Sequence, residues 1–317
     1  MTDGYRQISF LSQGTTCDAW FFPPASDGAL TGPTGSPVVV MAHGFGGTKD
    51  SGLAPFARHL AESGLAVLAF DYRGFGASDG QPRQRVSMAA QVQDYHAAIG
   101  AAIAQPGVDP ARTVLWGISQ SAGHVLSVAA ERTDIRTVIA MAPMIDGISA
   151  GRNALSQVGV GAVARSAMTG VRSAVAGRLG GRPIMMPLVG RPGDRAALTA
   201  EGYFESYTAL AGPTWRNEVD AAVGLELGAY RADRHADRIT AAVLVQIADF
   251  DRAAPPHAAA KAAFKARAEV RHYPCDHFDL FAGNQWFETA VAHQVHFLRR
   301  HLLDAAHSEI RTTEATA

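Results

Sequence analysis

The chain has 317 residues, a formal net charge of −1, 47% hydrophobic residues and 18% charged residues. This composition is ordinary for a globular protein with a substantial core, and it excludes general disorder. Because nucleic acids and anionic membranes usually require a concentrated basic face, the near-neutral charge predicts neither as a partner and favours a small substrate.

Two cysteines, Cys17 and Cys275, are too few for a disulfide framework or a structural zinc site, so we expect a reducing cytoplasm. The first residues, MTDGYRQISF, lack the basic and apolar pattern of a signal peptide. No run approaches the roughly 20 apolar residues of a membrane helix. We therefore expect neither secretion nor membrane insertion.

Strand and helix patterns alternate along the first half of the chain. Alternating segments at 6–12 and 15–22 predict an antiparallel hairpin, and the apolar run 37–42 predicts a buried strand. Next come a helix over 53–63, a strand over 65–72, a helix over 86–104, a strand over 112–118, a helix after Ser119 and a strand over 135–142. Since parallel neighbours need crossover connections, this order predicts a mostly parallel, doubly wound sheet with helices on both faces.

The alternation stops near Pro143 and resumes at a strand that begins near Ala241. The roughly 90 residues between them are too many for an unstructured loop. Helical spacing over 154–179 and over 198–212 predicts a mainly helical cap, and a last strand and helix follow over 268–274 and 288–305. We place the core at 1–144 and 237–306, the cap at 145–236 and a flexible polar tail at 307–317.

The segment Gly117-Ile118-Ser119-Gln120-Ser121 lies between a predicted strand and a predicted helix. A nucleophile elbow needs this setting, because a sharp turn there projects the serine oxygen above the sheet. Small residues are required two positions before and after the serine, and Gly117 and Ser121 supply them, although the usual pattern ends in glycine. A chance match in a chain rich in small residues is the alternative that the setting disfavours. Ser119 is the predicted nucleophile.

A serine hydroxyl needs a base to remove its proton and an acid to orient that base. Asp249 and Asp251 follow the strand that begins near Ala241, at the carboxyl end where α/β sheets place ligand chemistry. We prefer Asp251 as the acid. Asp249 stays open as the alternative, since it would otherwise cap a local turn.

His277 lies in the loop after the last predicted strand and is the preferred base. The order Ser119, Asp251, His277 is the order of a serine hydrolase built on this kind of sheet. His272, within a strand, and His257, at the start of a helix, are the rivals.

The segment His43-Gly44-Phe45-Gly46-Gly47 follows a buried strand, and backbone N–H groups there can stabilise a developing oxyanion. We assign this role to the N–H of Phe45 and to the N–H of Gln120, which directly follows the nucleophile. His43 is interpreted as a residue that braces the loop.

Two further features have simpler explanations. Gly74-Phe75-Gly76 lacks the third glycine and the helix of a dinucleotide loop, so a tight turn is expected. Cys275 is interpreted as a neighbour of His277 without a catalytic role.

Taken together, HGFGG, DYRGFGASDG, GISQSAG and the late Asp and His loops resemble the α/β-hydrolase superfamily over nearly the whole chain. More narrowly, AHGFGGTKD, DYRGFGASDG and HFDLF are similar to a group of dienelactone hydrolases, X-prolyl dipeptidyl peptidase catalytic domains and fungal polyketide acyltransferases or thiohydrolases. The resemblance implies acyl-enzyme chemistry on esters, thioesters, lactones or amides without a cofactor or metal. It also implies roles for Ser119, Asp251, His277 and the Phe45 backbone.

The leading hypothesis is hydrolysis of a carboxylic ester, lactone or thioester. Acyl transfer, hydrolysis of a carbon–carbon bond and peptide hydrolysis could use the same triad, and a noncatalytic ligand-binding or interaction protein is the alternative from a different class. Because methionine adapts to irregular apolar ligands, we expect a medium-sized apolar acyl group. The candidate walls of its pocket are Met141, Met144, Met185, Met186 and Leu188.

Overall fold

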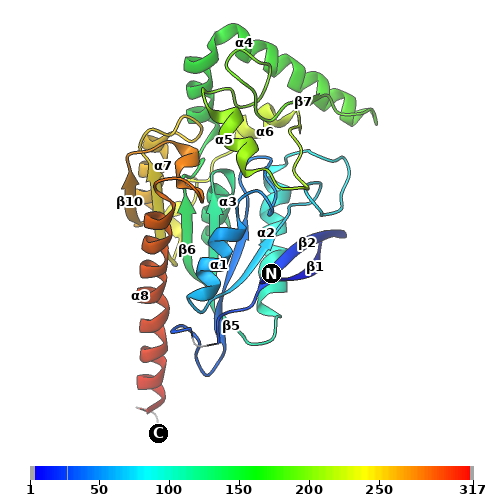
Figure 1. Ribbon diagram of the computed structural model, residues 1–317. Helices are drawn as coiled ribbons and strands as arrows, with labels where there is room; N and C mark the ends of the chain where they lie inside the picture. Colours follow the sequence, from blue (N-terminus) through cyan, green and yellow to red (C-terminus); the bar gives the residue numbers. More distant parts are fainter. Residues whose placement is uncertain (1–3, 27, 315–317) are drawn as a thin grey trace.

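A computed structural model describes residues 4–26 and 28–314 (Figure 1). Its centre is an eight-stranded sheet in the order β1-β2-β4-β3-β5-β6-β9-β10. The strands are β1 (Arg6–Ser12), β2 (Thr15–Phe22), β3 (Ser36–Ala42), β4 (Ala66–Phe70), β5 (Val108–Ile118), β6 (Ile135–Met141), β9 (Ala242–Ala248) and β10 (Glu269–Tyr273).

Strand β2 is antiparallel to β1 and β4, whereas every other neighbouring pair in this sheet is parallel. All residues of β3 and β4 are buried, as expected for central parallel strands covered on both faces. The predicted α/β-hydrolase fold, with a mostly parallel sheet and an antiparallel N-terminal hairpin, is confirmed.

Helices cover both faces of the sheet. Helix α1 (Ala54–Glu62) contacts α8 (Phe287–Glu314), and these two lie on one face. Helices α2 (Met88–Ile103) and α3 (Gln120–Glu131) contact each other on the other face, where α7 (Pro256–Lys265) and the short helix η1 (Ala236–Arg238) continue the layer. Their apolar sides are rich in alanine, so the helices approach the β-branched side chains of the sheet closely.

The chain changes direction in the middle of the sheet. From β3 it passes to β4 on one side, then returns to β5 on the other side of β3 and continues to β6. The carboxyl ends of β3 and β5 therefore form the crevice where α/β sheets bind ligands. The loop after β3 and Ser119 after β5 both lie at this crevice.

The segment between β6 and β9, which we call the cap, contains α4 (Gly147–Arg178), β7 (Met185–Met186), α5 (Tyr203–Leu210), β8 (Val219–Asp220) and α6 (Val223–Ala229). Strands β7 and β8 form a small antiparallel pair of their own. In Figure 1, α4, α5 and α6 lie over one end of the sheet, while α8 extends beyond the opposite end. The cap therefore covers the crevice.

Helix α8 continues to Glu314. The predicted flexible tail at 307–317 thus falls partly on this helix, and its last residues, 315–317, lie outside the described residues. The described part of the chain holds no helix that is both long and apolar enough to cross a membrane.

Candidate active site

Ser119 lies between β5 and α3 with φ 58° and ψ −120°, a backbone conformation that is strained for a residue with a side chain. The turn is possible because its neighbours are small. A Cβ added to Gly117 would lie 2.4 Å from the Ser121 carbonyl oxygen, and one added to Gly44 would lie 2.8 Å from the Ile118 carbonyl oxygen. The geometry is that of a nucleophile elbow, as its sequence pattern suggested.

Ser121 occupies the position where the usual pattern has glycine, and its hydroxyl braces the elbow. The Ile118 N–H donates to Ser121 Oγ at 2.8 Å, and Ser121 Oγ donates to the Ala42 carbonyl at 2.8 Å. These bonds join the end of β3 to the end of β5. Where glycine would have no side chain, Ser121 therefore places a fully buried hydroxyl that is hydrogen-bonded on both sides.

Asp251 and His277 form a buried pair, and His277 lines the same cavity as Ser119. His277 Nδ1 lies 2.6 Å from Asp251 Oδ2, with exposed side-chain fractions of 6% and 1%. The other carboxylate oxygen of Asp251 accepts the N–H groups of Ala253 at 2.7 Å and Ala254 at 2.6 Å. Its orientation is therefore set before any substrate binds.

Burial by itself would lower the pKa of His277, because it disfavours the imidazolium ion. The adjacent carboxylate of Asp251 outweighs that effect through its charge and hydrogen bond, assisted by the charge of Asp276. The pKa of His277 is consequently raised above its ordinary value.

The two rival histidines lie elsewhere. His272 Nδ1 contacts Asp249 Oδ1 at 2.6 Å, but this pair is exposed. His257 is an exposed residue in the first turn of α7. Of the two aspartates that the sequence left open, the one that contacts His277 is Asp251.

The loop after β3 is held from several directions. Tyr207 of α5 donates to the Phe45 carbonyl at 2.8 Å. Lys49 donates its backbone N–H to Asp71 Oδ1 and its ammonium group to Asp71 Oδ2, each at 2.6 Å. Lys49 also pairs with Asp18 at 2.6 Å. These contacts hold the Phe45 carbonyl and the backbone at Lys49, as the oxyanion donor predicted at Phe45 would require.

His43 stacks on Phe281 with ring centroids 5.8 Å apart and an interplanar angle of 21°. Burial lowers its pKa to about 4, so it is neutral at physiological pH. A Cβ on Gly47 would lie 1.9 Å from His43 Nδ1, so the glycine leaves space for the ring. This packing fits the expected bracing role of His43.

A cavity of about 370 Å³ separates the elbow from the cap. Ser119, His277, Phe45 and Gln120 all line it. Its remaining wall comes mainly from apolar and small side chains of the cap, including Ala150, Val163, Ala167, Leu198 and Val223.

Met144 and Met186 line the cavity, whereas Met185 and Leu188 are absent from its described walls, which corrects their assignment as pocket residues. Met185 belongs to β7 beside Met186, and alternation along a strand directs the two side chains to opposite sides. Leu188 is buried against the loop after β3, where a Cβ on Gly46 would lie 2.5 Å from its Cδ1 atom. Met141 is a core residue of β6.

The structure also reveals residues of the site that the sequence did not identify. Asp276 accepts bonds from the Tyr203 hydroxyl at 2.9 Å, from Arg252 Nε at 2.6 Å and from the His277 N–H at 2.8 Å. Arg252 also donates to the Glu201 carbonyl at 2.9 Å. The position of Arg252 directly after Asp251 was the available sequence signal for its place in the site. The cap residues that Arg252 and Asp276 contact are distant from them in sequence.

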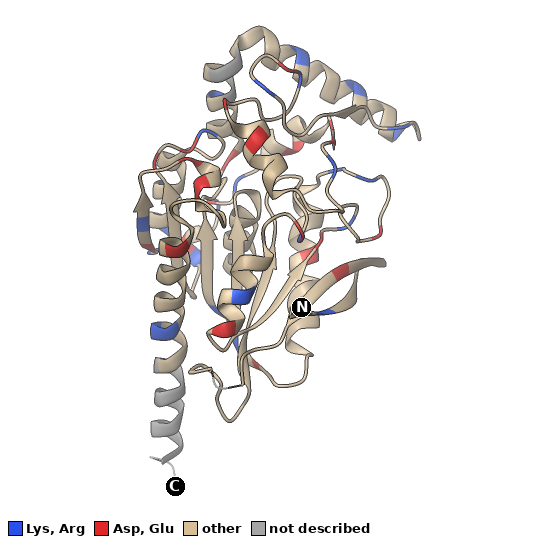
Figure 2. Cartoon of the chain, in the orientation of Figure 1, with Lys and Arg blue, Asp and Glu red and all other residues tan. Residues whose placement is uncertain are grey.

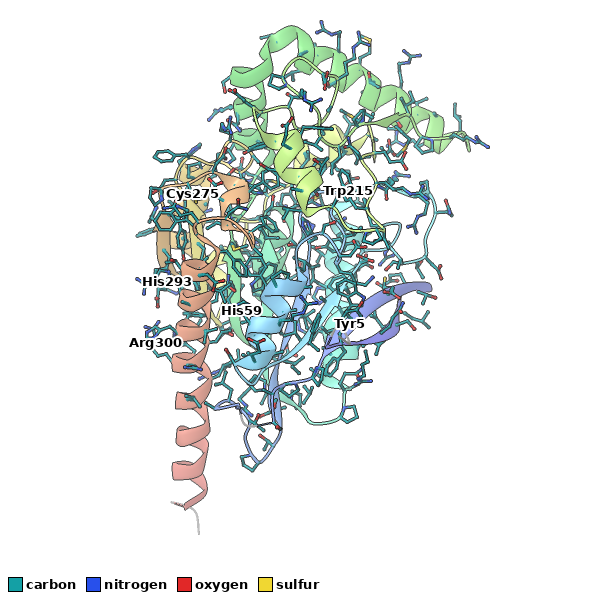
Figure 3. The ribbon with its side chains drawn as sticks, viewed as in Figure 1. Tyr5, His59, Trp215, Cys275, His293 and Arg300 are labelled. Carbon is teal, nitrogen blue, oxygen red and sulfur yellow. The ribbon has the colours of Figure 1, made fainter. Side chains whose placement is uncertain are left out.

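The aromatic residues Tyr207 and Trp215 stack with centroids 5.3 Å apart at the junction of cap and core. Figure 3 shows Trp215 just beneath α5, and Cys275 among the loops beside α7 and β10. Both cysteines are free thiols. Burial raises the pKa of Cys275 to about 12, which disfavours a reactive thiolate.

A strained serine after a central strand, a buried acid–histidine pair and a cap over the crevice define a hydrolase of the α/β class. The family model described as "Serine aminopeptidase, S33" matches residues 35–276, and the chain belongs to this family. The protein is accordingly a serine hydrolase.

Similar proteins agree with this classification. The chain is 34% identical over 298 residues to Quorum-quenching protein AidA of Acinetobacter baumannii, covering 92% of this chain and 94% of that protein. It is 31% identical over 162 residues to Thiohydrolase aneE of Aspergillus aculeatus, covering 51% and 50%. The crystal structure of Alpha/beta hydrolase GrgF from Penicillium sp. sh18 has a TM-score of 0.77 at 23% identity, covering 94% of this chain and 99% of that chain.

Proposed function

We propose that this enzyme hydrolyses a carboxylic ester, lactone or thioester through an acyl-enzyme on Ser119, with His277 as base and Asp251 as the orienting acid. The observation that carries the proposal is the 2.6 Å contact between His277 Nδ1 and Asp251 Oδ2, with His277 lining the cavity that Ser119 also lines. With Nδ1 engaged, Nε2 is the ring nitrogen that can accept the serine proton.

In the first step, Ser119 Oγ attacks the acyl carbon and its proton passes to His277 Nε2. The new oxyanion accepts N–H bonds from Phe45 and Gln120, and the leaving group departs with the proton from His277. Water then attacks the acyl-enzyme by the same route and releases the acid and free Ser119. Asp251 remains ionised throughout and stabilises the imidazolium ion of His277 in both steps.

We propose that the cap recognises an apolar acyl group of the substrate. The cap-side walls combine aliphatic side chains with residues that have little or no side chain, such as Gly151, Ala167, Gly170 and Gly224. These cap-side walls leave volume and present no charged side chain, although Arg252 of the core also lines the cavity. Apolar contact is the main recognition that the cap side can provide. In this proposal the cap, residues 145–236, is the domain that selects the substrate.

The names of the similar proteins, a quorum-quenching protein and a thiohydrolase, support small acyl compounds as substrates. A cytoplasmic location also remains our proposal, based on two unpaired buried cysteines.

The test is labelling with a fluorophosphonate followed by peptide mass spectrometry. We expect one adduct on Ser119, and we expect Ser119→Ala to lose both the label and turnover of p-nitrophenyl esters. Ser156→Ala, at an exposed serine of α4, is the matched control and should retain both. Correctly folded protein without an adduct on Ser119 would refute the proposal.

A panel of esters, thioesters, lactones and aminoacyl amides then defines the substrate class. Product analysis with added alcohols separates hydrolysis from acyl transfer, because a transferase would form a new ester in place of the free acid. The same panel measures cleavage of a diketone and of an amide, which tests the carbon–carbon bond hydrolase and the peptidase alternatives.

A further inference from the structure

Helix α4 is bent at Gly159, whose φ of 76° and ψ of 164° are not helical. The stretch after the bend, residues 160–178, is therefore a helix with its own direction. One of its faces covers the active-site cavity, since Val163, Ser166, Ala167 and Gly170 line it. This spacing of three and four residues defines the inner face.

A second side of the same stretch, about 120° around the helix from the inner face and ending at the C-cap residue Leu179, is also apolar. Val160, Met168 and Leu179 are exposed by 75%, 66% and 82%, and Val171 and Val175 by 49% and 47%. Together with exposed Ala164 they recur every three or four residues, so they form one continuous stripe, which we call the outer stripe. An apolar helix surface that extends this far around the helix is normally covered.

Charge in this region is of one sign. Residues 147–193 contain six arginines and no Asp, Glu or Lys, although the whole chain has a net charge of −1. At 100° per residue, Arg165 and Arg172 lie along one edge of the outer stripe and Arg178 along the other. All three are exposed. Figure 2 shows blue but no red along α4, at the periphery of the molecule.

We propose that the outer stripe and its arginines dock on an anionic lipid surface, with α4 lying in the plane of the interface. A helix whose exposed apolar residues are flanked by arginines can bind such surfaces by apolar insertion and by attraction to anionic headgroups. A second copy is a poorer occupant, because self-association would bring two arginine-rich faces together.

Docking in this orientation brings α4, whose inner face lines the cavity, against the lipid interface. The proposal does not depend on hydrolysis by Ser119, so binding can be measured on its own. It revises the expectation of no membrane partner, which followed from the net charge and overlooked how unevenly the charge is distributed.

The experiment is co-sedimentation of the full chain with vesicles of phosphatidylcholine alone or of equal parts phosphatidylcholine and phosphatidylglycerol. We expect binding to the anionic vesicles, weakened by added salt, and little binding to the neutral ones. The double variant Arg165→Gln/Arg172→Gln should lower the partition coefficient on the order of tenfold, because each basic residue near an anionic surface contributes a several-fold factor. Met168→Ser/Val171→Ser should also weaken binding.

Matched controls are Arg58→Gln on α1 and Phe264→Ser on α7, which change an exposed arginine and an 86% exposed phenylalanine far from the outer stripe. They should bind as the wild type does. Circular dichroism and p-nitrophenyl acetate turnover verify that every variant is folded, since none of these residues lines the cavity.

Absent binding, or equal binding to both kinds of vesicle, would overturn the proposal. Sedimentation velocity provides a separate check. A dimer that Met168→Ser/Val171→Ser dissociates would show that a second copy covers the outer stripe, and would overturn it as well.

Discussion

Asp251 and His277 are in contact at 2.6 Å inside the protein, while Asp249 and His272 are in contact at the same distance on its surface. The two pairs are close in sequence, and both combine an aspartate after β9 with a histidine in or after β10. Only the pair of Asp251 and His277 reaches the cavity, through His277. Burial and position, rather than the identity of the side chains, distinguish the pair that we propose to be catalytic from the surface pair.

Asp251→Asn should lower kcat on the order of 10⁴-fold, because the amide no longer holds the reactive tautomer of His277 or stabilises its imidazolium ion. Asp249→Asn is the matched variant and should retain most activity, since the Asp249 side chain contacts only exposed His272 among the hydrogen bonds described. Steady-state kinetics with p-nitrophenyl acetate compares them. The reverse ranking would assign the acid role to Asp249.

Activity should fall on the acid side of a pH profile, because only neutral His277 can accept the serine proton. Its pKa is raised above the ordinary value of 6.5, so the acid limb of kcat/KM should lie above that pH. The Asp251→Asn variant loses the carboxylate charge, whereas the burial that lowers the pKa of His277 remains. The acid limb of its residual activity should therefore move to lower pH. An acid limb that stays in place in the variant would show that another group titrates.

Ser121→Ala should destabilise the protein by about 1–3 kcal/mol, because it removes the hydroxyl that satisfies the Ile118 N–H. Ser127→Ala, which removes a 3.2 Å bond from a half-buried serine to the Gly123 carbonyl, should have a smaller effect. Urea unfolding measures both. Equal losses would mean that the Ser121 hydroxyl does not brace the elbow.

His124 should make stability depend on pH. Its ring is fully buried, contacts the Tyr230 hydroxyl at 2.9 Å and Gln91 Oε1 at 3.1 Å, and has a pKa lowered by burial to about 3. Between the ordinary value of 6.5 and about 3, the unfolded chain binds a proton that the folded chain does not. The stabilisation is therefore complete above pH 6.5 and is lost progressively as the pH falls.

His124→Gln should reduce the slope of the unfolding free energy with pH by about 1.4 kcal/mol per unit within that interval. Urea unfolding of the variant and the wild type at several pH values gives both slopes. His43, with its pKa lowered to about 4, should leave a residual slope in the variant. An unchanged slope would show that His124 does not titrate as described.

Local patterns were sufficient for much of the fold. The hairpin at 6–12 and 15–22 coincides with β1 and β2, and the strand before Ser119 ends at Ile118. These elements were predictable because alternation and buried apolar runs act over a few residues. The structure of the cap was harder to predict from the sequence, because α4 is apolar on two sides and a single periodicity does not describe it.

By itself, the sequence determined the class of the protein: Ser119 in a strand-to-helix setting, a Gly-rich loop after β3, and Asp and His loops after β9 and β10. The tertiary structure decided which aspartate contacts His277, why Ser121 can replace glycine, and which cap residues form the walls of the cavity. The physical reason is distance along the chain. Chemistry at the elbow depends on neighbouring residues, whereas the carboxylate pairing and the cavity walls depend on contacts between segments that only folding brings together.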